Sequence, residues 1–198
     1  RSSARAGGTL IWATRFQEVS TTERQGAKGG PKLTSFSYFG NFAIALCEGE
    51  IACLRRIWAD GKELDIEDVT IRIYRGTQDQ PPDPLIEAKQ GTGSAPAYRG
   101  TAYVVFDRFP LENFGNRIPQ FSFEVVRPVN SLNAKIKAVT IIPGSTEYGY
   151  APLPVTRQVQ EGETVSQNRH VQHGATDWAA SIDELQALCP NLESVALV

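Results

Sequence analysis

Methionine is absent from this sequence, and cysteine and histidine are scarce, with three and two residues among 198. The cysteines, Cys47, Cys53 and Cys189, are too few and odd in number for a disulfide framework, so we expect folding in a reducing compartment. No apolar run approaches the roughly 20 residues that span a bilayer, and no segment near the start has the pattern of a signal peptide. The sequence therefore predicts neither a disulfide-stapled domain nor a membrane protein.

An excess of one charge is missing too. Lys and Arg number 20 and Asp and Glu number 22, a net charge of −2, with both signs interspersed. A dedicated nucleic-acid binder would carry a basic excess, so this function class is disfavoured. Nine Phe, six Tyr and three Trp argue against global disorder. The length suits one large domain or two small ones with a real core.

A starting methionine is also missing. The first residue is Arg1, and the last four residues, 195–198, are an apolar run without the turn residues that close a domain. We therefore expect the chain to be a piece of a longer polypeptide.

Motifs of catalytic sites are absent as well. The sequence has no Gly-x-Ser-x-Gly elbow, no phosphate-binding glycine loop before a helix and no His-Glu-x-x-His. Glu48 and Glu50 are an acid–base candidate if their pKa values separate, but two charged residues beside a glycine are more typical of a solvated turn. We predict no catalytic, cofactor-binding or metal-binding residues and no cofactor, and no ligand-binding residue is identified.

The cysteines and histidines leave two further possibilities open, a contact between two thiols and a zinc site. Cys47 and Cys53 flank a turn and face one another if that turn closes a hairpin, whereas two buried thiols acting as small hydrophobic groups are the favoured interpretation. His170 and His173 with a cysteine are a zinc candidate, although no Cys-x2-Cys or His-x3-His pair supports it. Histidines in a polar segment are more often solvated than catalytic.

A basic, glycine-rich loop covers residues 24–32. Its cations, Arg24, Lys28 and Lys32, lie among three glycines and a proline. Phosphate contact is the alternative to the favoured interpretation, a solvated surface loop.

Strand patterns dominate the first 142 residues. Segments rich in β-branched and aromatic residues, or alternating apolar with polar ones, are expected at 9–19, 33–46, 51–59, 62–64, 69–74, 103–109, 120–126 and 135–142. Gly40 predicts a bulge or bend. Asp60 and Gly61 lie between strand-like flanks and predict a type I′ hairpin turn, because both tolerate positive φ. Residues 77–98, with three prolines, are expected to be a long surface excursion with one helical turn at 85–89.

The C-terminal third has a different pattern. Residues 143–174 are polar and interrupted by proline, and are expected to wrap a surface with only weak strand character at 155–159. Residues 176–188 predict a helix, which Pro190 ends, with apolar residues at helical spacing. Ser181 and Glu184 match a capping box, which would start the regular helix there.

The last four residues are apolar at successive positions, which is typical of a strand buried on both faces of a parallel sheet. Because we expect most of that sheet to be missing, we predict that residues 195–198 lie as a strand or extended tail without a full set of partners. The predicted fold is therefore mainly β, with β-sandwich or barrel-like domains and a C-terminal helix and strand that begin an α/β domain. We divide the chain into a β-rich part at 1–143, a connector at 144–175 and a truncated α/β domain at 176–198.

One ordered set of motifs resembles a known family. Phe-Ala-Ile-Ala-Leu-Cys-Glu-Gly at 42–49 and Ile-Trp-Ala-Asp-Gly-Lys at 57–62 resemble the hub segment of the large tail-tip protein of gene transfer agents and related long-tailed phages. Further similar pieces lie at 73–77 with 83–88, at 96–106 and at 113–125. Glu50 departs from the pattern, where the family usually has proline.

The resemblance implies a structural part of a virion tail tip, or baseplate hub, that forms a homotrimer around the tail axis. Implied partners are other tail-tip proteins (distal tail, hub and the end of the tape measure), with host receptors engaged through other domains and DNA passing without specific binding. The particle would assemble in the bacterial cytoplasm. The family continues into a TIM-barrel-like domain similar to glycoside hydrolases, so we predict no enzyme here and assign any hydrolysis to absent parts.

A second function class stays open on the residues. Trp12, Trp58 and Tyr98 would form a sugar-stacking platform in a carbohydrate-binding or wall-hydrolysing module acting on the host envelope, whereas core packing is the favoured interpretation. An exposed row of these rings beside carboxylates would favour the module.

Overall fold

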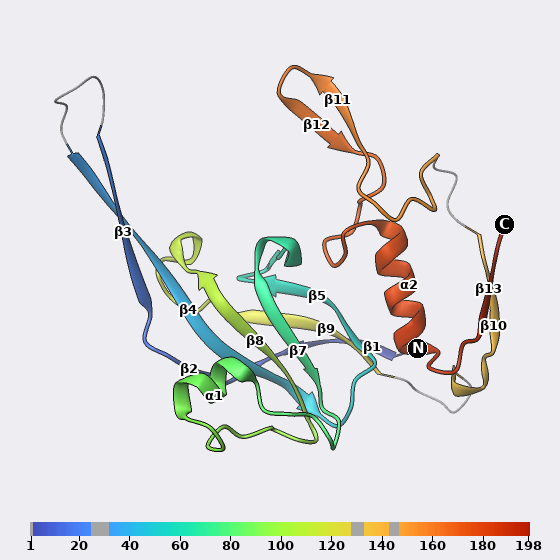
Figure 1. Ribbon diagram of the computed structural model, residues 1–198, viewed down its shortest axis with the longest axis horizontal. Coiled ribbons are helices and arrows are strands. Elements are labelled where there is room, and N and C mark those ends of the chain that lie inside the picture. The colour runs from blue at the N-terminus through green and yellow to red at the C-terminus, as the bar shows by residue number, and fades with distance from the viewer. Residues whose placement is uncertain (1, 25–31, 128–132, 143–146) are drawn as a thin grey trace.

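The computed structural model describes residues 2–24, 32–127, 133–142 and 147–198, and two antiparallel sheets form its body (Figure 1). The first, the β4 sheet, has the order β2-β4-β8-β7, with β3 also paired to β4. Its strands are β2 (Thr9–Ala13), β3 (Gln17–Arg24), β4 (Lys32–Glu48), β7 (Thr70–Arg75) and β8 (Thr101–Pro110). The second, the β9 sheet, contains in order β1 (Ser2–Gly7), β9 (Phe121–Arg127), β5 (Cys53–Ala59) and β6 (Lys62–Glu63).

The inner faces of the two sheets share one apolar core. Alternate residues of β4, Phe42, Ile44 and Leu46, enter it, as their period of two predicts. The Phe42 and Phe106 rings stack with centroids 4.8 Å apart, and Phe121 of β9 lies against both. Each fully buried Phe contributes about 2–3 kcal/mol of transfer free energy. This sandwich confirms the mainly β fold class.

The single strand expected at 9–19 is instead divided between two strands, β2 and β3, which pair with different parts of β4. Strand β2 pairs with residues 42–45 of β4, while β3 pairs with residues 32–39. This division lies beside Gly40, where the pairing of β4 with β8 shifts register and confirms the predicted bulge. Asn41 fixes the bend, because its side-chain oxygen accepts a hydrogen bond from the Arg108 amide at 2.7 Å.

The Asp60–Gly61 turn between β5 and β6 also forms as predicted. Both residues have positive φ, 48° at Asp60 and 83° at Gly61. The Asp60 carboxylate accepts hydrogen bonds from the Gln120 amide and from Arg117, which together hold the pKa of Asp60 below its ordinary value. The turn is therefore tied to the chain that enters β9.

The outer face of the β4 sheet is covered by the excursion at 76–100, which contains α1 (Pro84–Gln90) as the sequence predicts. Ile86 of α1 is fully buried against Tyr103 and Val105 of β8. Gln80 organises the excursion, since its amide nitrogen donates to the carbonyls of Ala97, Tyr98 and Thr101. Its side-chain oxygen accepts the Gly76 amide at 2.9 Å.

Gly76 begins this excursion under two constraints. Its φ is +83°, and a Cβ there would lie 2.7 Å from the Gly49 carbonyl oxygen and 2.9 Å from the Ala102 nitrogen. Gly115 also has a positive φ, +64°, but open space around it.

We expect Gly76→Ala to lower the free energy of unfolding by about 3 kcal/mol, and Gly115→Ala by about 1 kcal/mol, in urea denaturation. Equal losses at the two sites would show that the backbone contact at Gly76 is unimportant.

The C-terminal part lies beside the β9 sheet (Figure 1). It holds the 3-10 turn η3 (Asn133–Lys135), β10 (Ala138–Ile141), β11 (Thr156–Gln160), β12 (Glu163–Ser166), α2 (Asp177–Leu188) and β13 (Ser194–Leu197). The polar connector is more ordered than predicted, since β11 and β12 form an antiparallel hairpin. No helix in the described ranges is long and apolar enough to cross a bilayer.

One expectation about this part is wrong in detail, and another is confirmed. Helix α2 begins before Ser181, because the Thr176 hydroxyl caps it by accepting the Ala179 amide at 3.0 Å, while Ser181 donates to the Asp177 carbonyl. Strand β13 does form, in parallel with β10 and outside both large sheets. All four of its residues are exposed, because β10 is its partner strand on one edge and no other described strand pairs with it. This is the strand without its full set of partners that the sequence predicts. The division of the chain into three domains stays a prediction.

Candidate functional site

The acid–base candidates lie apart from any catalytic geometry. Glu48 and Glu50 are exposed at the end of β4, and Glu50 pairs with Arg75 at 3.5 Å. The Glu48 carbonyl accepts a hydrogen bond from Arg127, so this turn connects the two sheets. The arrangement is that of a solvated turn held by ion pairs, the interpretation that the sequence favours.

The cysteines do not face one another. Cys47 pairs with Ala102 in the β4 sheet, whereas Cys53 pairs with Val126 in the β9 sheet, so the hairpin alternative is wrong. Both side chains are half-buried rather than buried. The turn after Cys47 passes the chain from one sheet to the other, which sequence spacing does not distinguish from a hairpin.

The histidines lie on the segment that precedes α2. His170 is at the surface with its Nδ1 2.7 Å from the Asp177 carboxylate. His173 is half-buried near Arg55 and Arg56, and both burial and these cations lower its pKa. Within the described ranges, no group of three or more His, Cys, Asp or Glu side chains is placed to hold a metal ion.

The three candidate aromatic residues form no common row. Trp12 packs with Tyr98 around the cluster under α1, on the outer face of the β4 sheet. Trp58 belongs to β5 in the other sheet, where the Arg5 guanidinium lies 4.1 Å from its ring centroid. All three rings are half-buried and pack against the protein. The arrangement is core packing and cation–π contact rather than a sugar platform.

A buried ionic cluster anchors α1 to the β4 sheet. Asp83 is fully buried and accepts hydrogen bonds from Arg72 Nε at 2.7 Å and from the Tyr74 hydroxyl at 2.9 Å. The same carboxylate caps α1 by accepting the Leu85 and Ile86 amides. Burial alone would raise the pKa of Asp83, but these donors, Arg72 first, hold it below its usual value. Both carboxylate oxygens of Asp83 are fully engaged by these donors, so the cluster serves to hold α1 on the sheet.

A long hairpin, the arm (residues 17–24 of β3 and 32–39 of β4), is the most exposed feature of the body. It projects away from both sheets (Figure 1). Val19, Leu33 and Phe36 are 38%, 55% and 53% exposed along it. Of the cations in the predicted basic loop, Arg24 and Lys32 are directly opposed at the last pair of the two strands, and Lys28 lies outside the described residues.

The arm is a paired β structure along its whole length. Eight residue pairs join its strands, with Thr22 opposite Thr34 and Glu18 opposite Tyr38. The Tyr38 hydroxyl donates to the Glu18 carboxylate at 2.7 Å, which raises the pKa of Tyr38. Because an isolated two-stranded hairpin is at best marginally stable in water, an arm of this kind gains stability when another surface covers it. The sequence predicts the β4 half of the arm as part of the strand at 33–46. It missed the β3 half beyond residue 19, since the Ser- and Thr-rich residues 20–24 show no apolar alternation.

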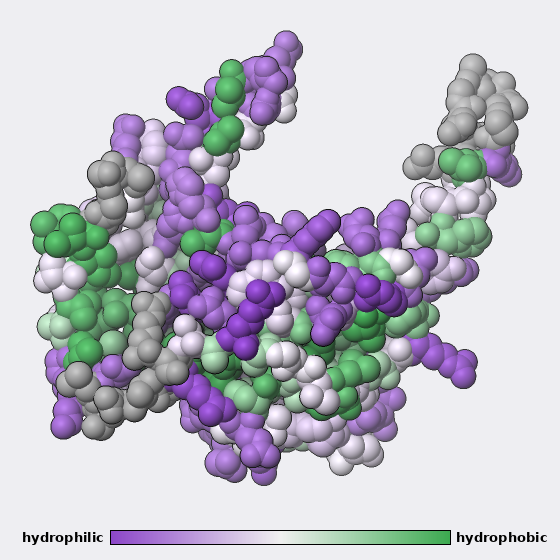
Figure 2. Space-filling model, turned by 180° about the vertical axis from the view of Figure 1, so that it is seen from behind, coloured by the Kyte–Doolittle hydropathy of each residue, from purple (hydrophilic) through white to green (hydrophobic). Residues whose placement is uncertain are grey.

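A second uncovered apolar surface is the C-terminal ladder, formed by β10 and β13. Leu197 and Val198 are 56% and 72% exposed, and Ile142 is 74% exposed. These side chains contribute to the apolar surface at the edge opposite the arm (Figure 2). The Tyr150 hydroxyl holds the end of the ladder through the Ile141 and Val198 carbonyls.

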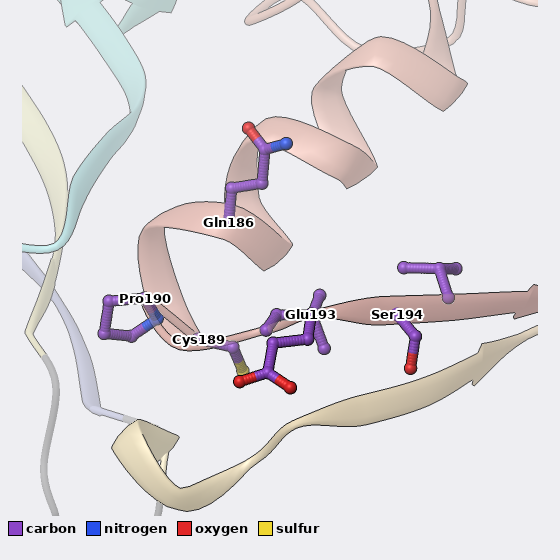
Figure 3. Close-up of a pocket in the computed structure, with 7 residues that line it drawn as sticks. Gln186, Cys189, Pro190, Glu193 and Ser194 are labelled. Carbon is purple, nitrogen blue, oxygen red and sulfur yellow. The ribbon is translucent and has the colours of Figure 1, made fainter.

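A hollow of about 470 Å³ lies between the end of α2 and β13 (Figure 3). Its lining is Gln186, Cys189, Pro190, Leu192, Glu193, Ser194 and Val195. Glu193 pairs with Lys137, and Cys189 caps the end of α2 through its amide. The lining contains no histidine or lysine, and Glu193, its one carboxylate, is paired with Lys137, so the residues that line the hollow do not form a Cys–His pair of the kind that activates a thiol.

Comparison with known proteins gives one informative similarity. No protein-family model matches the chain, and no curated protein does. A solved structure described as the virion of a native gene transfer agent (GTA) particle contains a chain 44% identical to this one. This chain is similar to a gene transfer agent virion protein.

The match covers 66% of this chain and 27% of the virion chain, with a TM-score of 0.48. The similarity is therefore one of sequence rather than of geometry. It agrees with the broader expectation from the sequence motifs, that the chain is a phage-like virion structural protein. The chain spans about a quarter of the length of the chain that it matches.

Proposed function

We propose that the chain is a structural component of a phage-like tail tip, a part of the baseplate hub that assembles around the tail axis and supports host attachment and DNA delivery. The observation that carries the proposal is the arm, a paired hairpin of eight residue pairs with exposed apolar side chains. Exposed apolar side chains of this kind are typical of a surface that binds another protein. The 44% identity to a virion chain indicates the kind of assembly.

The finer parts of the proposal concern partners. The hub is a homotrimer that contacts other tail-tip proteins, with host receptors engaged through other domains. Its net charge of −2 suits a wall along which DNA passes without specific binding, because a basic wall would retain it. The chain itself has no catalytic role, and any glycoside-hydrolase-like activity belongs to other parts of the polypeptide.

Labelling within assembled particles tests this placement. A short epitope inserted between Glu161 and Gly162, at the exposed turn of the β11–β12 hairpin, is displayed without disturbing either large sheet. Immunogold labelling of purified particles is expected at one end of the tail, and cryo-electron microscopy at three copies around its axis. An unlabelled wild-type particle is the control. Label on the head, or none on purified particles, would overturn the proposal.

A further inference from the structure

Charged and polar contacts join the C-terminal part to the β9 sheet. Helix α2 meets β5 through Arg55, whose Nε lies 3.3 Å from Glu184 of α2. The Nη1 of Arg55 lies 3.3 Å from Glu124 of β9, so one guanidinium links the helix to both strands. Contacts of this kind are weaker than apolar packing and depend on the charge of every group nearby.

The segment before α2 adds a second attachment. Arg169 Nη2 lies 2.6 Å from the Asp65 carboxylate, and its Nε donates to the Gly174 carbonyl at 3.0 Å. The Ile66 amide, in the 3-10 turn η1 (Ile66–Asp68), donates to the Gln172 carbonyl at 3.2 Å. Residues 169–174 are therefore held against the body at two points.

His173 lies between these two attachments. Its Nδ1 is buried and has no hydrogen-bond partner. The charged groups that act on the ring are Arg55 and Arg56 of β5, Glu63 of β6 and Glu124 of β9. Both carboxylates are already engaged by arginines: Glu63 with Arg56, and Glu124 with Arg55 and Arg56. A proton on His173 would therefore add a cation beside two others, in a place where water screens it poorly.

We propose that His173 makes this joint sensitive to pH, so that its protonation releases α2 and residues 169–174 from the β9 sheet while the sandwich stays folded. The released state is the one that binds the additional proton.

The direction and the pH range follow from the groups present. Burial first, then Arg55 and Arg56, hold the pKa of His173 below its ordinary value of 6.5, so the docked state is favoured above pH 6.5 and loses stability as pH falls below it. Asp65 does not respond there, because its hydrogen bond from Arg169 lowers its pKa from an ordinary value of 3.8. His170 faces the Asp177 carboxylate rather than Arg55 and Arg56.

The test measures the distance between the two parts. Spin labels are attached at Lys62→Cys in β6 and Gln186→Cys in α2, both exposed, in the 198-residue chain with its three native cysteines replaced by alanine. Electron–electron double resonance at pH 7.5 is expected to give one short distance. Below pH 6.5 a longer population should grow, its ratio to the short one rising about tenfold for each pH unit until His173 is protonated in the docked state. Far-UV circular dichroism should stay unchanged.

Three variants separate this role from general acid instability. His173→Gln should keep the short distance at both pH 7.5 and pH 5.5, and His173→Arg should show the long one at both. His170→Gln, the matched control, should retain the wild-type response. A wild-type distance that does not change down to pH 5.5, or an equal change in His173→Gln, would overturn the proposal. If His173→Gln fails to fold, the NMR titration of the His173 Cε1 proton decides: a ring that titrates at or above 6.5 also overturns it.

Discussion

Replacing Asp83 by alanine is expected to lower the free energy of unfolding by about 3–5 kcal/mol, because it removes one partner of a buried ion pair and leaves the other charge behind. Asp83 is fully buried, and Arg72 donates to its carboxylate at 2.7 Å. The substitution would also leave the Tyr74 hydroxyl without its acceptor and α1 without its N-cap. Urea denaturation followed by tryptophan fluorescence measures the loss.

The neighbouring carboxylate supplies a matched control. Asp107 also faces Arg72, at 3.2 Å, but its side chain is 28% exposed and caps no helix. Asp107→Ala should therefore cost about 1 kcal/mol or less. Hydrogen bonds from Arg72 and the neighbouring donors lower the pKa of Asp83. The contribution of Asp83 to the free energy of unfolding is therefore present at neutral pH and is lost as pH falls below about 4. Equal losses for the two variants would show that the cluster acts only as surface charge.

Removing the outer part of the arm is expected to prevent incorporation into particles without unfolding the chain. Val19 and Ser37 are directly opposed across the two strands, so residues 20–36 can be replaced by Asn-Gly in a two-residue hairpin loop. None of the described residues in this range belongs to the core between the sheets. The free energy of unfolding should change by less than about 1 kcal/mol, while the copies per purified particle, measured by quantitative mass spectrometry, should fall at least about tenfold.

Point substitutions refine this prediction. Leu33→Ser and Phe36→Ser together remove two exposed apolar side chains of the arm, whereas Thr22→Ser and Thr34→Ser remove only methyl groups from the same strands. Only the first pair should reduce incorporation. Normal incorporation of the shortened chain would mean that the arm is not the assembly surface.

Local patterns in the sequence were sufficient for the core and its turns. The alternation of Phe42, Ile44 and Leu46 needs only the period of a strand, and the Asp60–Gly61 turn needs only two residues that tolerate positive φ. The predicted start of the regular helix at Ser181 was wrong, because Thr176 and Ser181 are both acceptable N-cap residues. The choice between them depends on tertiary contacts, since Thr176 is fully buried where the chain returns from Asn168.

Features that depend on distant parts of the chain were not predictable. Arg72 and Asp83 are eleven residues apart on a strand and a helix cap, and nothing in their spacing indicates that they meet. The joint at His173 depends on Arg55, more than a hundred residues earlier. The parallel pairing of β13 with β10 could not be read from its apolar run, because a run of this kind does not specify which strand lies beside it.

The length of β4 has a mechanical consequence. Its 17 residues form one continuous strand, on the order of 55 Å long, that begins in the arm and ends in the core. A force applied at the arm therefore acts along β4 and loads its hydrogen bonds to β2 and β8 together, in shear, rather than one after another. The arm would transmit a pull or a push directly to the Phe42–Phe106 stack, as a stiff lever rather than a flexible tether.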